Sequence, residues 1–219
     1  MLGQSNTIGS LSWLARGSLI AQEFGWRAVQ GLLRQDGDRQ VCSTDLAAKE
    51  TAIARFLQDY PQAVEAGRGH PGLRGCEDVR WSEFPECPAA IPVLLHGLLD
   101  RTAAPEAKRV LTNSILNSVR EMNLAMPAVL PFLFRLASDP QVPVQSGLLG
   151  LLVSIAGFSE PIDGRNEAMV RWFGSDSDHP EREQCRAVFT ENASVVAMLA
   201  EELTRPDDRA KLRQAAGLV

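Results

Sequence analysis

The chain has 219 residues, 45% of them hydrophobic and 22% charged, which is too apolar for a disordered protein and long enough for one large domain or a short solenoid. A net charge of −5 supplies no surplus of Lys and Arg for a broad phosphate-binding face. The composition therefore disfavours nucleic acid and favours basic protein partners, although it leaves room for a local basic groove. With one Tyr and few alternating runs of β-branched residues, the sequence argues against β-sheets.

Residues 1–65 predict helices that cap one end of the fold, because their apolar residues recur at helical spacing. These are Leu11, Leu14, Leu19 and Ile20 in a first helix, Trp26, Val29, Leu32 and Leu33 in a second, and Leu46, Ile53, Phe56 and Leu57 in a third. Thr44 or Asp45 can cap the third helix. The first 20 residues lack a basic start followed by an apolar run, so we expect neither a signal peptide nor a membrane span, and a cytoplasmic protein.

Residues 66–88 predict a glycine-rich loop, and long loops inside compact domains are usually functional or disordered. Trp81, Glu83 and Glu86 follow the glycines. Aromatic residues beside carboxylates suit an interface with a basic protein, so these three are candidate partner-binding residues. The alternative is that Trp81 packs beneath its own loop as part of the core.

Residues 89–156 contain a repeated helix pair, which is the most informative feature of the sequence. Residues 88–100 recur 39 positions later as residues 127–139; both copies begin with Pro, carry a second Pro four residues on, and end at Asp. Each copy is followed by a second amphipathic run, with Pro in the intervening turn. The apolar positions of these runs are Val110, Leu111, Ile115, Leu116 and Val119 in the first copy and Leu148, Leu151, Leu152 and Ile155 in the second.

In each copy the second Pro, Pro92 or Pro131, falls one turn inside the first helix, where it is expected to bend the helix. A third copy is predicted in residues 185–219, where Val195, Val196 and Leu199 begin a run with the same pattern. An insert of residues 157–184 separates it from the second copy.

The insert carries most of the negative charge: seven acids and three arginines give −4, whereas residues 89–156 have a net charge of +1. It contains Trp172, followed by Asp176, Asp178 and Glu181. We therefore expect these four residues to contribute to partner binding, unless Trp172 packs under its own loop and the acids are merely solvated.

Proline-rich first helices, an Asp-Pro turn and leucine-rich second helices together resemble bacterial HEAT-repeat proteins, and in particular those that serve as immunity proteins of polymorphic toxins. The residues that carry this resemblance best are 129–140 and 147–156. The resemblance covers roughly residues 80–219 and implies an all-α fold, a right-handed α-solenoid of HEAT-like helix pairs. It also implies a binding module that occludes a basic toxin domain. A regulatory or assembly scaffold is the alternative, because a fold does not fix a function.

We expect no catalytic centre, metal site, cofactor or small-molecule substrate. The sequence has no HExxH, GxSxG, phosphate-binding loop or dinucleotide fingerprint. The net charge of only +1 over the two clear repeats, residues 89–156, also disfavours a HEAT-type DNA glycosylase, because such an enzyme needs a basic concave face.

Cysteines and histidines do not change this expectation. Without CxxC or zinc-finger spacing, the cysteines are expected to be free thiols, although Cys76 and Cys87 flank the glycine-rich loop and could pair. His96 occupies the place of Arg135 in the next copy, so a solvent-facing position is expected. Asp176, Asp178 and His179 could hold a metal ion, but a turn explains the same residues.

Overall fold

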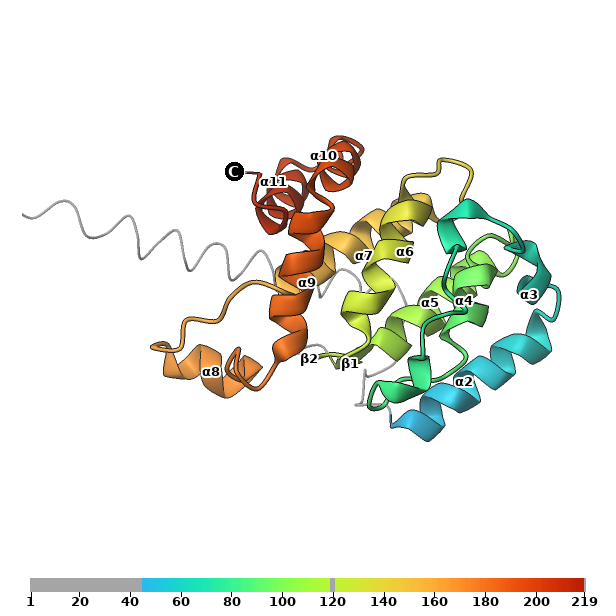
Figure 1. Cartoon of the computed structure of the whole chain (residues 1–219), viewed down its shortest axis with the longest axis horizontal. Coiled ribbons are helices and arrows are strands. Elements are labelled where there is room, and N and C mark those ends of the chain that lie inside the picture. Colours follow the sequence, from blue (N-terminus) through green and yellow to red (C-terminus); the bar gives the residue numbers. More distant parts are fainter. Residues whose placement is uncertain (1–44, 119–120, 219) are drawn as a thin grey trace, which may run out of the picture. The chain divides into compact units, whose positions relative to one another are not determined.

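A computed structural model describes residues 45–118 and 121–218, all of which belong to one compact unit, Val41–Val219. These residues form ten α-helices, α2–α11, with short 3₁₀ turns and one two-stranded ribbon (Figure 1). The all-α prediction is therefore confirmed. Within the described residues, no helix has the length and apolarity needed to cross a bilayer. The two helices expected before residue 44, and Cys42, lie outside the described residues.

Helix α2 (Leu46–Asp59) begins at one of the two residues expected to cap it. The Asp45 carboxylate accepts a hydrogen bond from the backbone N–H of Ala48 at 2.8 Å, which satisfies one of the unpaired amides at the start of the helix. Its apolar face buries Ile53 and Phe56. A one-turn helix, α3 (Ala63–Ala66), follows and leads into the glycine-rich loop.

The first predicted pair is formed by α4 (Ile91–Gly97) and α5 (Ala104–Ile115), which pack against each other. The prediction that Pro92 bends α4 one turn in is wrong, because the helix begins three residues later than Pro88 and Pro92 falls in its first turn. A proline there loses no intrahelical hydrogen bond, since the first amides have no partner inside the helix.

The second run of this copy also ends earlier than predicted. Helix α5 stops at Ile115, and the chain continues as strand β1 (Leu116–Ser118), which pairs antiparallel with β2 (Glu121–Met122). The buried Asn123 closes this ribbon: its backbone N–H donates to the Ile115 carbonyl at 2.9 Å, and its side chain donates to the Pro85 carbonyl at 3.1 Å.

The second predicted pair is formed by α6 (Met126–Ala137) and α7 (Gln145–Phe158). Here the predicted positions of the prolines agree with the structure, since Pro127 lies in the first turn of α6 and Pro131 lies inside the helix. The bend expected at Pro131 stays a prediction. The turn between the helices contains Pro140 and Pro143, as expected.

After α7 come α8 (Glu167–Phe173), α9 (Pro180–Glu191) and the third predicted pair, α10 (Ala193–Glu201) and α11 (Pro206–Ala215). The expected boundary at residues 184 and 185 falls in the middle of α9, so the insert ends inside a helix. Pro206 is the first residue of α11.

All the described helices except α8 contribute to one apolar core. α5 packs against α2 and α7, α7 packs against α11, and α6 packs against α9 and α10. Gly97 lets α2, α4 and α5 approach closely, since a Cβ there would lie 2.7 Å from the Phe56 ring and 2.9 Å from the Ala107 Cβ. Phe134 of α6 meets Phe189 of α9 edge to face, with ring centroids 5.3 Å apart.

Candidate functional site

Helix α8 stands out because none of its seven residues is buried, although it contains Met169, Val170, Trp172 and Phe173. Trp172 is 55% exposed, and the other three are partly exposed. A short helix that keeps an indole at the surface departs from the usual burial of large aromatic side chains, and such exposed apolar groups mark interaction sites when they cluster.

Asp176 fixes the acidic insert (residues 157–184) to α9. Its carboxylate lies 3.4 Å from the guanidinium groups of both Arg182 and Arg186, and it also accepts a hydrogen bond from the backbone N–H of Ile162 at 3.3 Å. Arg182 is buried and donates to the Phe173 carbonyl at the end of α8, while Arg186 donates to the Ser159 carbonyl at 2.6 Å. The predicted binding residue Asp176 thus holds both ends of the insert in place.

Glu181 is likewise internal. Its side chain is 3% exposed, and its carboxylate accepts a hydrogen bond from His179 Nδ1 at 3.0 Å. Gly174 makes room for this histidine: its φ is +72°, and a Cβ would lie 2.4 Å from His179 Nε2. Asp178 is exposed and accepts a hydrogen bond from the Ser175 hydroxyl at 2.7 Å.

Charge on the outside of the insert remains negative. Its exposed carboxylates include Asp163, Glu167, Asp178 and Glu183, and its exposed guanidinium groups are Arg165 and Arg171. Along the chain, Asp163 precedes α8, Glu167 is its first residue, and Asp178 and Glu183 follow it. Of the four insert residues predicted to bind a partner, Trp172 and Asp178 are therefore at the surface, Glu181 is buried, and the partly exposed Asp176 is engaged in contacts within the protein.

The other three predicted residues lie at the end of the glycine-rich loop. Trp81, in a 3₁₀ turn (Trp81–Glu83), is 3% exposed and packs against Phe132, with ring centroids 6.2 Å apart. This placement matches the core interpretation of Trp81. Glu83 is exposed and pairs with Arg80 at 2.6 Å, and the backbone carbonyl of Glu86 accepts a hydrogen bond from the buried Lys49 at 3.0 Å.

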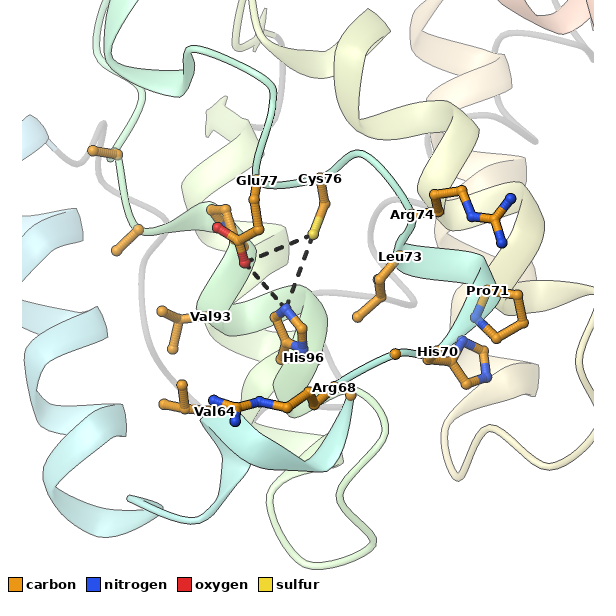
Figure 2. A pocket seen from close by; sticks show the side chains of 15 residues that line it. Val64, Arg68, His70, Pro71, Leu73, Arg74, Cys76, Glu77, Val93 and His96 are labelled. Atoms are coloured by element: carbon orange, nitrogen blue, oxygen red, sulfur yellow. Dashed lines mark hydrogen bonds and ion pairs between the residues drawn. The ribbon is translucent and has the colours of Figure 1, made fainter.

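A cavity of about 710 Å³ lies between α3, the glycine-rich loop and α4 (Figure 2). Its lining includes Arg68, His70, Arg74, Cys76 and His96. His70 closes one side: its Nδ1 accepts the Gly72 N–H at 3.1 Å, which leaves the proton on Nε2 to face the Asp139 carboxylate at 3.2 Å.

Three potential metal ligands meet at this cavity: Cys76, Glu77 and His96. His96 Nε2 lies 3.2 Å from Glu77 Oε1 and 4.0 Å from Cys76 Sγ, and the sulfur lies 4.0 Å from the same carboxylate oxygen (Figure 2). The prediction that His96 faces solvent is wrong, since its side chain is 14% exposed. The glycine-rich loop folds over α4 and covers His96. Arg135, which occupies the equivalent position on α6, is exposed and donates a hydrogen bond to the Arg74 carbonyl at 3.1 Å.

The cluster does not have the geometry of a nucleophilic triad. In a triad the orienting carboxylate binds the imidazole nitrogen opposite the nucleophile. Here Glu77 and Cys76 approach the same nitrogen, and the other one, Nδ1, is buried without a hydrogen-bond partner. Burial, together with the neighbouring Glu77, raises the pKa of the Cys76 thiol, which lowers its thiolate fraction and its reactivity.

Cys76, Cys87 and Cys185 are all buried free thiols, so the pairing of Cys76 with Cys87 that the sequence left open is not present. The three-ligand cluster was missed because Cys76 and His96 are 20 positions apart, with no local motif. The only available signal was a Cys-Glu pair in a glycine-rich loop.

Comparison of the chain with protein-family models, with curated proteins and with solved structures gives no match.

Proposed function

We propose that this chain is a protein-binding module in which HEAT-like helix pairs stack as a right-handed solenoid and present α8 to a basic partner protein. The observation that carries the proposal is the exposure of Trp172 on a helix without a single buried residue. Tryptophan is enriched among residues whose truncation weakens a protein interface most, because it transfers a large apolar area into the interface.

Charge favours a basic partner. Asp163 and Glu167 precede Trp172, and Asp178 and Glu183 follow it, all with exposed side chains. Carboxylates around an apolar anchor steer a positively charged protein toward it and disfavour acidic competitors. The ion pairs of Asp176 with Arg182 and Arg186 also support a binding role for α8. They hold the segment next to α8 in place before a partner arrives, which reduces the entropy lost on binding.

The resemblance to HEAT-type immunity proteins suggests a toxin domain as this basic partner. In that case the module acts by steric occlusion, covering the toxin's active cleft without performing chemistry. The same contact surface also suits a regulatory or assembly scaffold, and the identity of the captured protein distinguishes the two.

The test is capture by the full-length chain from a lysate of its source organism, followed by affinity measurement with the purified partner. We expect Trp172→Ala to weaken the complex about 30-fold or more, the loss typical of a central interface residue. Asp163→Lys combined with Glu167→Lys should slow association, and the slowing should diminish at high salt. Met198→Ala, which removes an apolar side chain 61% exposed on α10, is the matched control and should leave affinity unchanged.

Equal binding by the wild type and the Trp172→Ala variant would remove α8 from the interface. Capture of an acidic protein or a nucleic acid as the specific ligand would contradict the proposed partner class. If the captured protein is a toxin, co-expression should protect cells, and the Trp172→Ala variant should protect them less well.

A further inference from the structure

We propose that Cys76, Glu77 and His96 form a binding site for a zinc-type divalent metal ion, with an open coordination position facing the cavity. In residues 45–118 and 121–218, these three are the single group of His, Cys, Asp and Glu side chains placed closely enough to share an ion. The inference is independent of α8 and of the proposed partner.

The separations between the three donor atoms fit such an ion. With Zn–S of about 2.3 Å and Zn–N or Zn–O of about 2.0–2.1 Å, tetrahedral angles place neighbouring ligand atoms roughly 3.3–3.6 Å apart. The observed separations are 3.2 Å for Glu77 Oε1 to His96 Nε2 and 4.0 Å from Cys76 Sγ to each of these atoms. A shift of the sulfur by about half an ångström would therefore complete the geometry.

Donor type selects the metal. A thiolate with an imidazole and one carboxylate suits Zn²⁺ and Co²⁺, whereas Mg²⁺ and Ca²⁺ take oxygen ligands alone. Three protein ligands leave one tetrahedral position open, the arrangement found where zinc binds water or a small ligand. That position would face the cavity of about 710 Å³, whose lining includes Arg68 and Arg74.

The loop that carries two of the ligands is held in place by its own contacts. The Cys76 backbone N–H donates to the Leu73 carbonyl at 3.0 Å, and the Cys76 carbonyl accepts the Trp81 indole N–H at 2.8 Å. Gly75, with φ of +85°, makes the turn directly before the ligands. The buried Trp81 therefore holds the backbone at Cys76, which pre-organises the site and reduces the cost of closing it around an ion.

The third ligand, His96, comes from helix α4, so the ion would join the loop to the helix. Gly67 is packed directly over the ring, since a Cβ there would lie 2.5 Å from His96 Nδ1. Figure 2 shows Nε2 of His96 directed toward Cys76 and Glu77, and no side chain larger than that of glycine would fit at position 67 beside Nδ1.

Cobalt titration of the chelator-treated full-length protein tests the site. A thiolate-bound Co²⁺ gives a sulfur-to-metal charge-transfer band, and we expect one equivalent to bind and Zn²⁺ to displace it. Cys76→Ser should remove the band, and His96→Ala should weaken binding about 100-fold or more. Glu77→Gln alters an exposed side chain and leaves the fold intact, and we expect it to weaken binding at least about tenfold.

Three control variants separate this site from others. Cys87→Ser and Cys42→Ser remove other thiols, and His70→Ala removes the other histidine of the cavity. All three should retain the band and the affinity of the wild type. A band that survives in Cys76→Ser, or an affinity unchanged in both Glu77→Gln and His96→Ala, would overturn the proposal. So would the absence of binding of both Co²⁺ and Zn²⁺ at about 100 µM, a concentration far above the Zn²⁺ dissociation constants of structural zinc sites.

Discussion

Asp176 and Asp178 lie two residues apart in the acidic insert and have opposite environments. Asp176 neutralises Arg182, whose side chain is 3% exposed, so Asp176→Asn would leave a buried guanidinium without its carboxylate partner. We expect this change to lower the free energy of unfolding by about 2–3 kcal/mol, less than the roughly 3–5 kcal/mol of a fully buried ion pair, because the Asp176 side chain is itself 30% exposed. Asp178→Asn, at an exposed site, should change it by less than about 0.5 kcal/mol.

Urea unfolding of the two variants measures this difference directly. Similar losses of stability in both would show that Asp176 does not anchor the insert. Similar losses of partner affinity, with both variants equally stable, would restore Asp176 as a contact residue.

The buried thiol of Cys185 makes the free energy of unfolding depend on pH above about pH 9. Burial raises the pKa of its thiol from 9.0 to about 12, so the folded state keeps a proton that the unfolded state releases. The resulting stabilisation is complete below pH 9 and is lost as pH rises toward 12, with a slope approaching about 1.4 kcal/mol per pH unit. Cys185→Ala should flatten the fall in unfolding free energy between pH 9 and 11, whatever it does to stability at pH 7.

Other groups titrate in the same range, which is why the slope and not the absolute stability is the readout. Burial raises the pKa of Cys87 to about 11 and acts with the same sign, whereas burial lowers the pKa of Lys49 and acts oppositely. An unchanged slope in Cys185→Ala would mean that this thiol is not protonated in the folded state at high pH.

At the scale of elements, the apolar residues at helical spacing in residues 89–156 predicted both helix pairs, although α7 is buried on all sides over residues 151–156 and not on one face alone. The spacing could not predict where the helices end. The two copies share the Pro-x-x-x-Pro pattern, but their first helices begin at different points of it. Pro92 therefore lies in the first turn of α4, whereas Pro131 lies inside α6. The helix start depends on tertiary packing, which local pattern does not contain. The ribbon after Ile115 was missed for the same reason.

The candidate sites were likewise predictable from sequence only in part. Composition predicted an acidic insert around Trp172 but left open whether this side chain is exposed or packed under its loop, and in the structure it is 55% exposed. Sequence could not tell Asp176 from Asp178, since their difference arises from arginines that α9 brings against one and not the other. Nor could it place Cys76 beside His96, because their contact depends on the fold of the whole loop between them.

At the scale of the molecule, every helix described between residues 45 and 218 except α8 contributes to one core that extends from Ile53 to Ala216. The Phe134–Phe189 contact is central to it, because it joins α6 of the second pair to α9. If the core is one cooperative unit, a cavity at Phe189 should destabilise the N-terminal helices as much as the C-terminal ones. We expect Phe189→Ala to lower the free energy of unfolding by about 3–5 kcal/mol.

Two signals recorded in the same urea titration distinguish global from local unfolding. Helical circular dichroism reports all helices, and the fluorescence of Trp81, measured with the other three tryptophans replaced by phenylalanine, reports the loop against α6. If the core unfolds as one cooperative unit, Phe189→Ala should shift the midpoints of the circular dichroism and fluorescence transitions equally and leave the dependence of unfolding free energy on urea unchanged. Thr190→Ala, at an exposed neighbour, is the control. If the helices after α8 unfold on their own, the slope will fall and the Trp81 midpoint will stay where it is, because repeat arrays lose cooperativity between units that share few contacts.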